Sequence, residues 1–210
     1  MTDWQKLEHD YYMPTFKRIP ITLIKGQGAK VWDENDKEYL DFVSGIAVNS
    51  LGHCHPVVVK AITEQANTLM HTSNLYYTIP QLKLAELLVK NSCMDKVFIC
   101  NSGTEATEGA VKLARRYGHI HLNGAYEVIT GTGSFHGRTL AMVSASGQSK
   151  FQEPYIPIPS GFINVDYNNI EALKAATNER TCAVMMEPIQ GESGVHLPDD
   201  DYLKKVKAWC

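Results

Sequence analysis

Residues 97–118 contain the feature that most constrains the fold of this chain. An apolar run, Val-Phe-Ile-Cys, ends at a turn of small residues, 101–104, and alanine, valine and leucine then recur at helical spacing up to Gly118. A short run of branched and aromatic residues predicts a buried strand, and acids followed by bases predict a helix with its C-cap at Gly118. A strand, a small turn and a helix N-terminus together form an anion-binding pocket. Many such turns in α/β proteins bind nothing, so this turn alone indicates function only weakly.

Further strands and helices alternate along the chain. Strands are expected over residues 126–130, 162–165 and 181–186, and helices over 57–70, 81–91, 169–176 and 199–210. This alternation predicts an α/β fold with a mainly parallel sheet and flanking helices. Ligands in such sheets bind beyond the carboxyl ends of the strands. Three strand ends carry unusual side chains and are therefore candidate site segments, 101–104, 131–138 and 187–192.

The first fifty residues have a different pattern. Residues 1–20 are mixed in character and predict an arm that packs on something else. Turn signals every 8–10 residues over 21–42 predict a small antiparallel meander. We therefore expect two domains, residues 1–50 with the arm and meander, and 51–210 with the parallel sheet.

Composition excludes several classes of function. The formal charge of −3 gives no reason to expect nucleic acid or a membrane surface as a partner. No apolar run approaches the roughly 20 residues that span a bilayer, and no signal peptide is visible, so we expect a cytoplasmic protein. Five cysteines without paired spacing predict reduced thiols. His53-Cys54-His55 could suggest zinc, but no second cluster follows, so no metal is expected.

The chemistry at the second and third strand ends is more specific. The first strand end is not a P-loop, because no Gly-Lys-Ser/Thr follows it, and the glycine pattern after residue 130 does not fit a dinucleotide fingerprint. Phe135 could stack on a planar heterocycle, and Arg138 could bind a carboxylate or equally form a surface ion pair. Glu187 and Glu192 could perform acid–base chemistry or simply cap a loop. Together the three ends favour a phosphorylated aromatic cofactor and a carboxylate substrate.

Three motifs in this order resemble those of class III aminotransferases. They are Asn101-Ser-Gly-Thr-Glu-Ala-x-Glu, Phe135-His-Gly-Arg-Thr and Glu187-Pro-Ile-Gln-Gly-Glu, and the resemblance extends over nearly the whole chain. It implies a pyridoxal 5'-phosphate enzyme of fold type I. Within the family, Gly45-Ile-Ala-Val-Asn and Thr72-Ser-Asn-Leu-Tyr-Tyr are most similar to the subgroup acting on N-acetylornithine. A glycine at position 45 leaves room for an acylated side chain.

The resemblance also implies roles for individual residues. Arg138 and Tyr12 would bind substrate, and Glu192 would be the catalytic acid that switches between the two half-reactions. The backbone of Gly103 and Thr104 would bind the cofactor phosphate, and Phe135 would stack on its ring. The complete set implied to bind the cofactor is Ser102, Gly103, Thr104, Phe135, His136, Glu187 and Gln190.

The family also requires an aspartate beside the cofactor and a Schiff-base lysine, and neither is found in its family context within these 210 residues. We therefore expect this chain to correspond to the N-terminal half of such an enzyme and to be inactive alone. The complete enzyme would transfer the terminal amino group of N-acetylornithine to 2-oxoglutarate in arginine biosynthesis, as a homodimer. Two alternatives stay open. The complete enzyme could use ornithine, succinylornithine or 4-aminobutyrate, or the chain could be a non-catalytic fragment that needs a partner chain.

Overall fold

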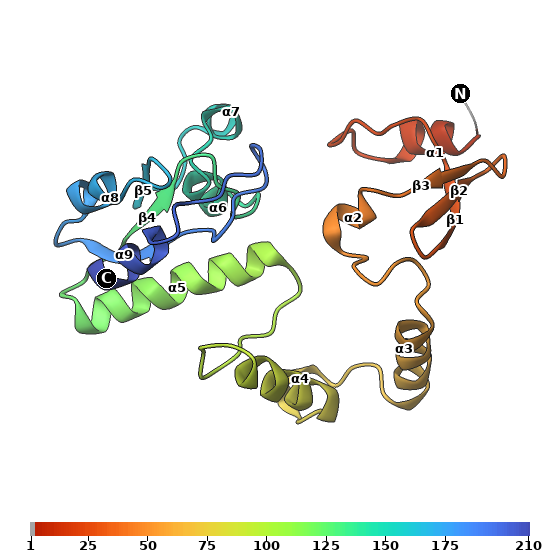
Figure 1. Ribbon diagram of the computed structural model, residues 1–210, viewed down its shortest axis with the longest axis horizontal. Coiled ribbons are helices and arrows are strands. Elements are labelled where there is room, and N and C mark those ends of the chain that lie inside the picture. Colours follow the sequence, from red (N-terminus) through yellow and green to blue (C-terminus); the bar gives the residue numbers. More distant parts are fainter. Residues whose placement is uncertain (1–2) are drawn as a thin grey trace. The chain divides into compact units, whose positions relative to one another are not determined.

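The computed structural model describes residues 3–210, which divide into two compact units (Figure 1). The first unit ends at Leu82, and the second comprises Lys83–Cys210. The expected boundary near residue 50 concerns domains of the complete protein and stays a prediction. Within the described residues, no helix is both long enough and apolar enough to cross a membrane.

The second unit is built on a parallel sheet with the order β5-β4-β6. Its strands are β4 (Glu127–Gly131), β5 (Phe162–Val165) and β6 (Thr181–Met185). Val128 pairs with Phe162 on one side and with Ala183 on the other, both in parallel register. The predicted parallel α/β sheet is confirmed, and all three of these strands lie where the apolar runs placed them.

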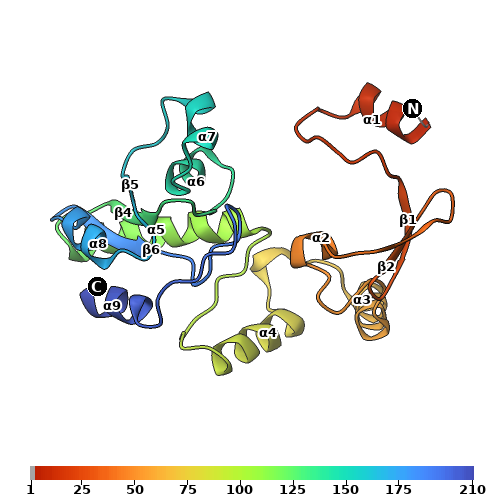
Figure 2. The same cartoon turned by 45° about the horizontal axis from the view of Figure 1, so that its top comes forward.

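Helices cover both faces of this sheet (Figure 1 and Figure 2). Because neighbouring strand residues point to opposite faces, Val128 packs with Val111 and Met142, whereas Ile129 packs with other helices, at Leu173 and Tyr202. The helices of this unit are α5 (Gly103–His121), α6 (Leu140–Ala145), α7 (Ser149–Gln152), α8 (Ile170–Ala176) and α9 (Tyr202–Trp209), with the short η2 (Glu153–Tyr155). α5 and α6 therefore cover one face, and α8 and α9 cover the other.

The first unit contains the predicted antiparallel meander. Its strands are β1 (Leu23–Gln27), β2 (Lys30–Asp33) and β3 (Glu38–Leu40), in that order. Buried Asp33 fixes the second turn, since its carboxylate accepts the Tyr39 hydroxyl at 2.7 Å and the N–H groups of Asn35 and Lys37. These hydrogen bonds hold the pKa of Asp33 below its usual value, and the bond from Tyr39 has the largest effect. The other elements are α1 (Asp3–Tyr11), α2 (Ser44–Ala47), α3 (Pro56–Thr68) and η1 (Ser73–Leu75), while α4 (Ile79–Lys90) crosses the boundary between the units.

The carboxylate of Asp41 supports an unusual turn in this unit. The short α2 is left-handed, since Ser44, Gly45, Ile46 and Ala47 all have φ between 52° and 65°. Asp41 Oδ1 accepts the N–H groups of Val43 and Ser44, at 2.9 and 2.8 Å. The other oxygen, Oδ2, lies 2.6 Å from His53 Nε2. His53 thus pairs with a carboxylate, and no group of three or more potential metal ligands occurs within residues 3–210.

Two local predictions were wrong. Residues 97–100 form no strand, because no described strand pairs with them, and Phe98 is 69% exposed. α5 continues past Gly118 to His121, so Gly118 is not its C-cap. Position 118 needs a glycine because α5 lies very close to the backbone at Ala125. A Cβ on residue 118 would lie 2.1 Å from the carbonyl oxygen of Ala125. In the expected arm, residues 3–11 form the helix α1.

Candidate functional site

The N-terminus of α5 is capped by its own sequence. Ser102 Oγ accepts the N–H of Glu105 at 3.2 Å, and the Glu105 carboxylate in turn accepts the N–H of Asn101 at 2.5 Å. This reciprocal pair ends the preceding loop and starts the helix. The N–H groups of Gly103 and Thr104 have no acceptor within the helix, so they are available to an anion.

The second site segment packs directly against this helix end. Thr107 Oγ1 donates a 2.6 Å hydrogen bond to the carbonyl of His136. Gly137 has φ +132°, and a Cβ on it would lie 2.5 Å from Thr104 Oγ1. Two residues further, Thr139 Oγ1 donates to Glu108 Oε1 at 2.5 Å, while the same hydroxyl caps α6. The first two site segments are therefore joined along one side of α5.

The third site segment contacts the second. The N–H of Phe135 lies 3.3 Å from Glu187 Oε2, and Gln190 Nε2 donates to the carbonyl of Thr132 at 3.0 Å. Ser193 Oγ donates to the carbonyl of Gly133 at 3.1 Å. Residues 131–138, which follow β4, thus contact both the N-terminal turns of α5 and residues 187–193, so this segment connects the other two.

Burial changes the ionisation of two groups in this region. The pKa of Glu187 is raised, chiefly by burial and also by the charge of Glu192, although its bond from the Phe135 N–H acts in the opposite direction. Burial lowers the pKa of His136 to about 4. The His136 ring is therefore neutral near pH 7, and its Nε2 has no hydrogen-bond partner among the described residues.

Arg138 lies on the solvent side of the same loop. Its guanidinium carbon is 5.8 Å from the centre of the Phe135 ring and 5.9 Å from that of Phe151. These three side chains and Tyr155 line a small cavity of about 90 Å³. A cation, aromatic faces and a cavity of this size suit a carboxylate attached to a short apolar group.

The structure thus brings most of the predicted site residues together. Glu192 is exposed and close enough to Glu187 to affect its pKa, while Gln190 is buried. Sequence reasoning missed the hydroxyl groups that connect the segments, those of Thr107, Thr139 and Ser146. Thr139 had a local signal, because it directly follows the last residue of the 131–138 segment, but the other two had none.

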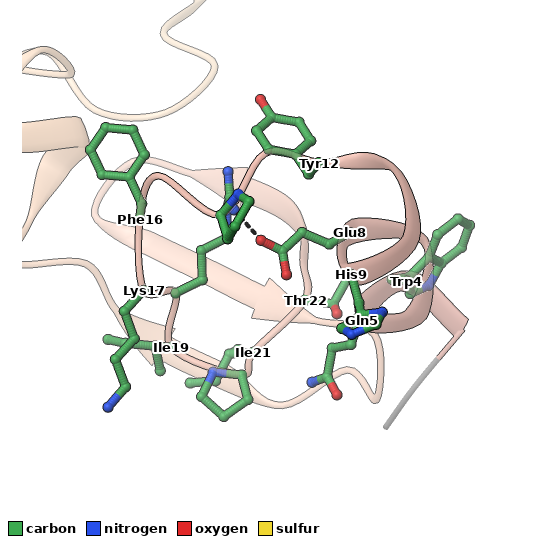
Figure 3. Close-up of a pocket in the computed structure, with 13 residues that line it drawn as sticks. Trp4, Gln5, Glu8, His9, Tyr12, Phe16, Lys17, Ile19, Ile21 and Thr22 are labelled. Atoms are coloured by element: carbon green, nitrogen blue, oxygen red, sulfur yellow. Dashed lines mark hydrogen bonds and ion pairs between the residues drawn. The ribbon is translucent and has the colours of Figure 1, made fainter.

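Tyr12 belongs to the first unit, where it lines a different cavity (Figure 3). The Arg18 guanidinium lies 4.5 Å from the centre of the Tyr12 ring and pairs with Glu8. The cavity has a volume of about 610 Å³ and lies between α1 and residues 12–22. The substrate role of Tyr12 stays a prediction.

The fold is that of a parallel α/β protein, in which ligands bind beyond the carboxyl ends of the strands, and the contacts above form a candidate site there. The aminotransferase class-III family profile matches residues 11–210, and the chain belongs to this family. Class III aminotransferases depend on pyridoxal 5'-phosphate.

Individual relatives agree with this assignment. The chain is 50% identical over 209 residues to acetylornithine aminotransferase of Methanocaldococcus jannaschii, covering 99% of this chain and 52% of the relative. The structure resembles ornithine aminotransferase of Toxoplasma gondii, with a TM-score of 0.92, 32% identity, and coverage of 99% of this chain and 50% of that one. N-acetylornithine aminotransferase of Stenotrophomonas maltophilia is 39% identical, with a TM-score of 0.79 and coverage of 98% and 50%. The chain spans about half the length of the relatives it matches.

Proposed function

We propose that the complete protein transfers the terminal amino group of N-acetylornithine to 2-oxoglutarate, with pyridoxal 5'-phosphate as cofactor, in arginine biosynthesis. It would act in the cytoplasm as a homodimer. The observation that carries the proposal is the direct contact of residues 131–138 with both the α5 terminus and residues 187–193. The 50% identity to an acetylornithine aminotransferase supports this donor.

The residues at this edge fit the cofactor. The free N–H groups of Gly103 and Thr104 suit its phosphate, and a Cβ at Gly103 would meet nothing within 4 Å, so the approach is open. Phe135 offers an aromatic face, and its backbone is fixed by Glu187. The bound cofactor would act as an electron sink. It would acidify the hydrogen on the substrate carbon that carries the reacting amino group.

The charges around the site suit an acidic substrate. Arg138 would bind a substrate carboxylate through its planar guanidinium. Glu192, which is exposed, would occupy or leave the substrate region as donor and acceptor alternate. Neutral His136 adds no second positive charge to the buried part of the loop. This loop would then discriminate carboxylates by Arg138 alone.

A chimaeric enzyme tests the proposal. Residues 1–210 would replace the aligned half of the M. jannaschii relative, which supplies the remaining sequence. We expect transamination with N-acetylornithine at a higher kcat/KM than with ornithine, succinylornithine or 4-aminobutyrate. The Arg138→Lys chimaera should lose most of this activity, because a point charge does not replace the planar fork. Preference for another donor would overturn the proposed substrate, and an inactive, correctly folded chimaera that binds the cofactor would overturn the proposed reaction.

A further inference from the structure

We propose that Phe151 is a positioning residue, which holds the guanidinium of Arg138 at the mouth of the small cavity. The inference rests on the proposed function in one respect, that Arg138 receives a substrate carboxylate. Phe151 lies outside the three site segments, and no motif in the sequence points to it.

Two rings, from different parts of the chain, lie within cation–π range of one guanidinium. The Phe135 and Phe151 ring centres are 5.8 and 5.9 Å from the Arg138 Cζ, and both rings line the same cavity. An aromatic ring attracts a cation without accepting a conventional hydrogen bond from it. The two rings therefore restrict where the Arg138 side chain lies without themselves accepting conventional hydrogen bonds from its N–H groups.

Phe151 is itself held firmly enough to act in this way. It is half-buried in α7, whose last residue, Gln152, donates from Nε2 to the carbonyls of Val143 and Ser144 at 3.2 and 3.1 Å. At the other end of α7, Gln148 Nε2 donates to the carbonyl of Ser134 at 2.8 Å. α7 is thus attached both to α6 and to the loop that carries Arg138.

A second cation contacts the same ring and offers a matched control. Lys150 Nζ lies 4.6 Å from the centre of the Phe151 ring, closer than the Arg138 guanidinium. Removing this charge leaves the ring in place, whereas replacing the ring by leucine keeps an apolar side chain and both cations. The two changes therefore separate the effect of the ring from that of local charge.

The experiment follows the Arg138 Nε–Hε resonance by nuclear magnetic resonance in the 210-residue chain labelled with ¹⁵N-arginine. Arg138→Lys identifies the signal, and the probe titrated is 2-oxoglutarate. Phe151→Leu should shift the signal, because the ring current is lost, and should weaken 2-oxoglutarate binding about threefold to tenfold. Phe151→Tyr keeps an aromatic ring and should therefore retain both the wild-type position of the Arg138 signal and the wild-type affinity for 2-oxoglutarate. Lys150→Gln should change this affinity less than twofold.

The outcomes separate this inference from the proposed function. If Phe151→Leu leaves both the signal and the affinity unchanged while the remaining arginine signals show a folded chain, the positioning role is wrong. If the signal shifts but wild-type binding of 2-oxoglutarate is absent or survives in Arg138→Lys, the positioning holds, and the carboxylate role of Arg138 is what fails.

Discussion

His136 is 5% exposed, and its burial makes the stability of the folded chain depend on pH. Its pKa is about 4 in the folded chain, against an ordinary value of 6.5. Between these values the unfolded chain binds a proton that the folded chain does not, so stability falls as pH decreases from 6.5 towards 4. The loss is about 3 kcal/mol at most, at 1.36 kcal/mol per pKa unit.

Urea unfolding between pH 4 and 7.5 measures this effect. His136→Gln removes the titrating group, so its free energy of unfolding should decrease less over this range than that of the wild-type chain. The carboxylates that also titrate there are common to both proteins and cancel in the comparison. Parallel pH dependences for the two proteins would show that His136 is readily protonated in the folded chain.

Gly137 is expected to tolerate no side chain. Alanine there would adopt an unfavourable φ of +132° and place its Cβ 2.5 Å from Thr104 Oγ1. We expect Gly137→Ala to lower the free energy of unfolding by about 2–4 kcal/mol. Gly103→Ala is the control, because its Cβ meets nothing within 4 Å, and it should differ from wild type by less than about 1 kcal/mol. Equal effects in a urea titration would contradict the close contact between the two segments.

For individual residues, the sequence predicted which chemical groups lie in the candidate site better than it predicted the contacts between them. Phe135, Arg138 and Glu187 were identifiable because aromatic, guanidinium and carboxylate groups are unusual at strand ends. The hydroxyl of Ser146, which binds the N–H of His136 at 3.1 Å, was not identifiable. Serine forms such bonds wherever the tertiary structure supplies a partner, so its role cannot be found from local pattern.

Among the elements, the contact between α5 and the chain entering β4 depends on Gly118. A Cβ at this position would lie 2.1 Å from the Ala125 carbonyl oxygen and 2.8 Å from Cys182 Cβ. We expect Gly118→Ala to lower the free energy of unfolding by about 3 kcal/mol or more, because backbone must move. In Gly109→Ala, on the same helix, the new Cβ approaches only the exposed Phe98 ring, at 2.9 Å.

Gly109→Ala should therefore be neutral or slightly stabilising, since alanine favours the helix. Chemical denaturation of both variants gives the comparison, with circular dichroism as the probe. A Gly118→Ala variant as stable as Gly109→Ala would show that α5 can move away from the sheet without cost.

The elements also show why some predictions succeeded and others did not. Val128 and Ile129 lie in a short apolar run that became the central strand, with β5 and β6 on either side. Residues 97–100 have the same kind of pattern but no neighbouring strand. A strand is stabilised by backbone hydrogen bonds to a neighbouring strand. An apolar run therefore predicts a strand reliably only when the neighbouring strand is also known.

For the whole molecule, the two units differ in how much apolar core they contain. Both clusters of buried hydrophobic residues lie within Lys83–Cys210, whereas Val31 is the one described hydrophobic residue of the first unit that is buried. We expect residues 83–210, expressed alone, to unfold cooperatively in urea, and residues 1–82 to show no cooperative transition. A cooperative transition in residues 1–82, or the absence of one in residues 83–210, would contradict this difference in core content between the two units.

The register of the parallel sheet has a consequence for the order of events during synthesis. β4 emerges from the ribosome early but acquires its second neighbour only when β6, which ends at Met185, has been made. Gln190 and Glu187, which contact residues 131–138, come later still. A nascent chain that stops before them has already made the N-terminal turn of α5, but it lacks the residues that contact the 131–138 segment from the other side. The contacts of residues 131–138 with Glu187 and Gln190 therefore form only after all three strands of this sheet have been made.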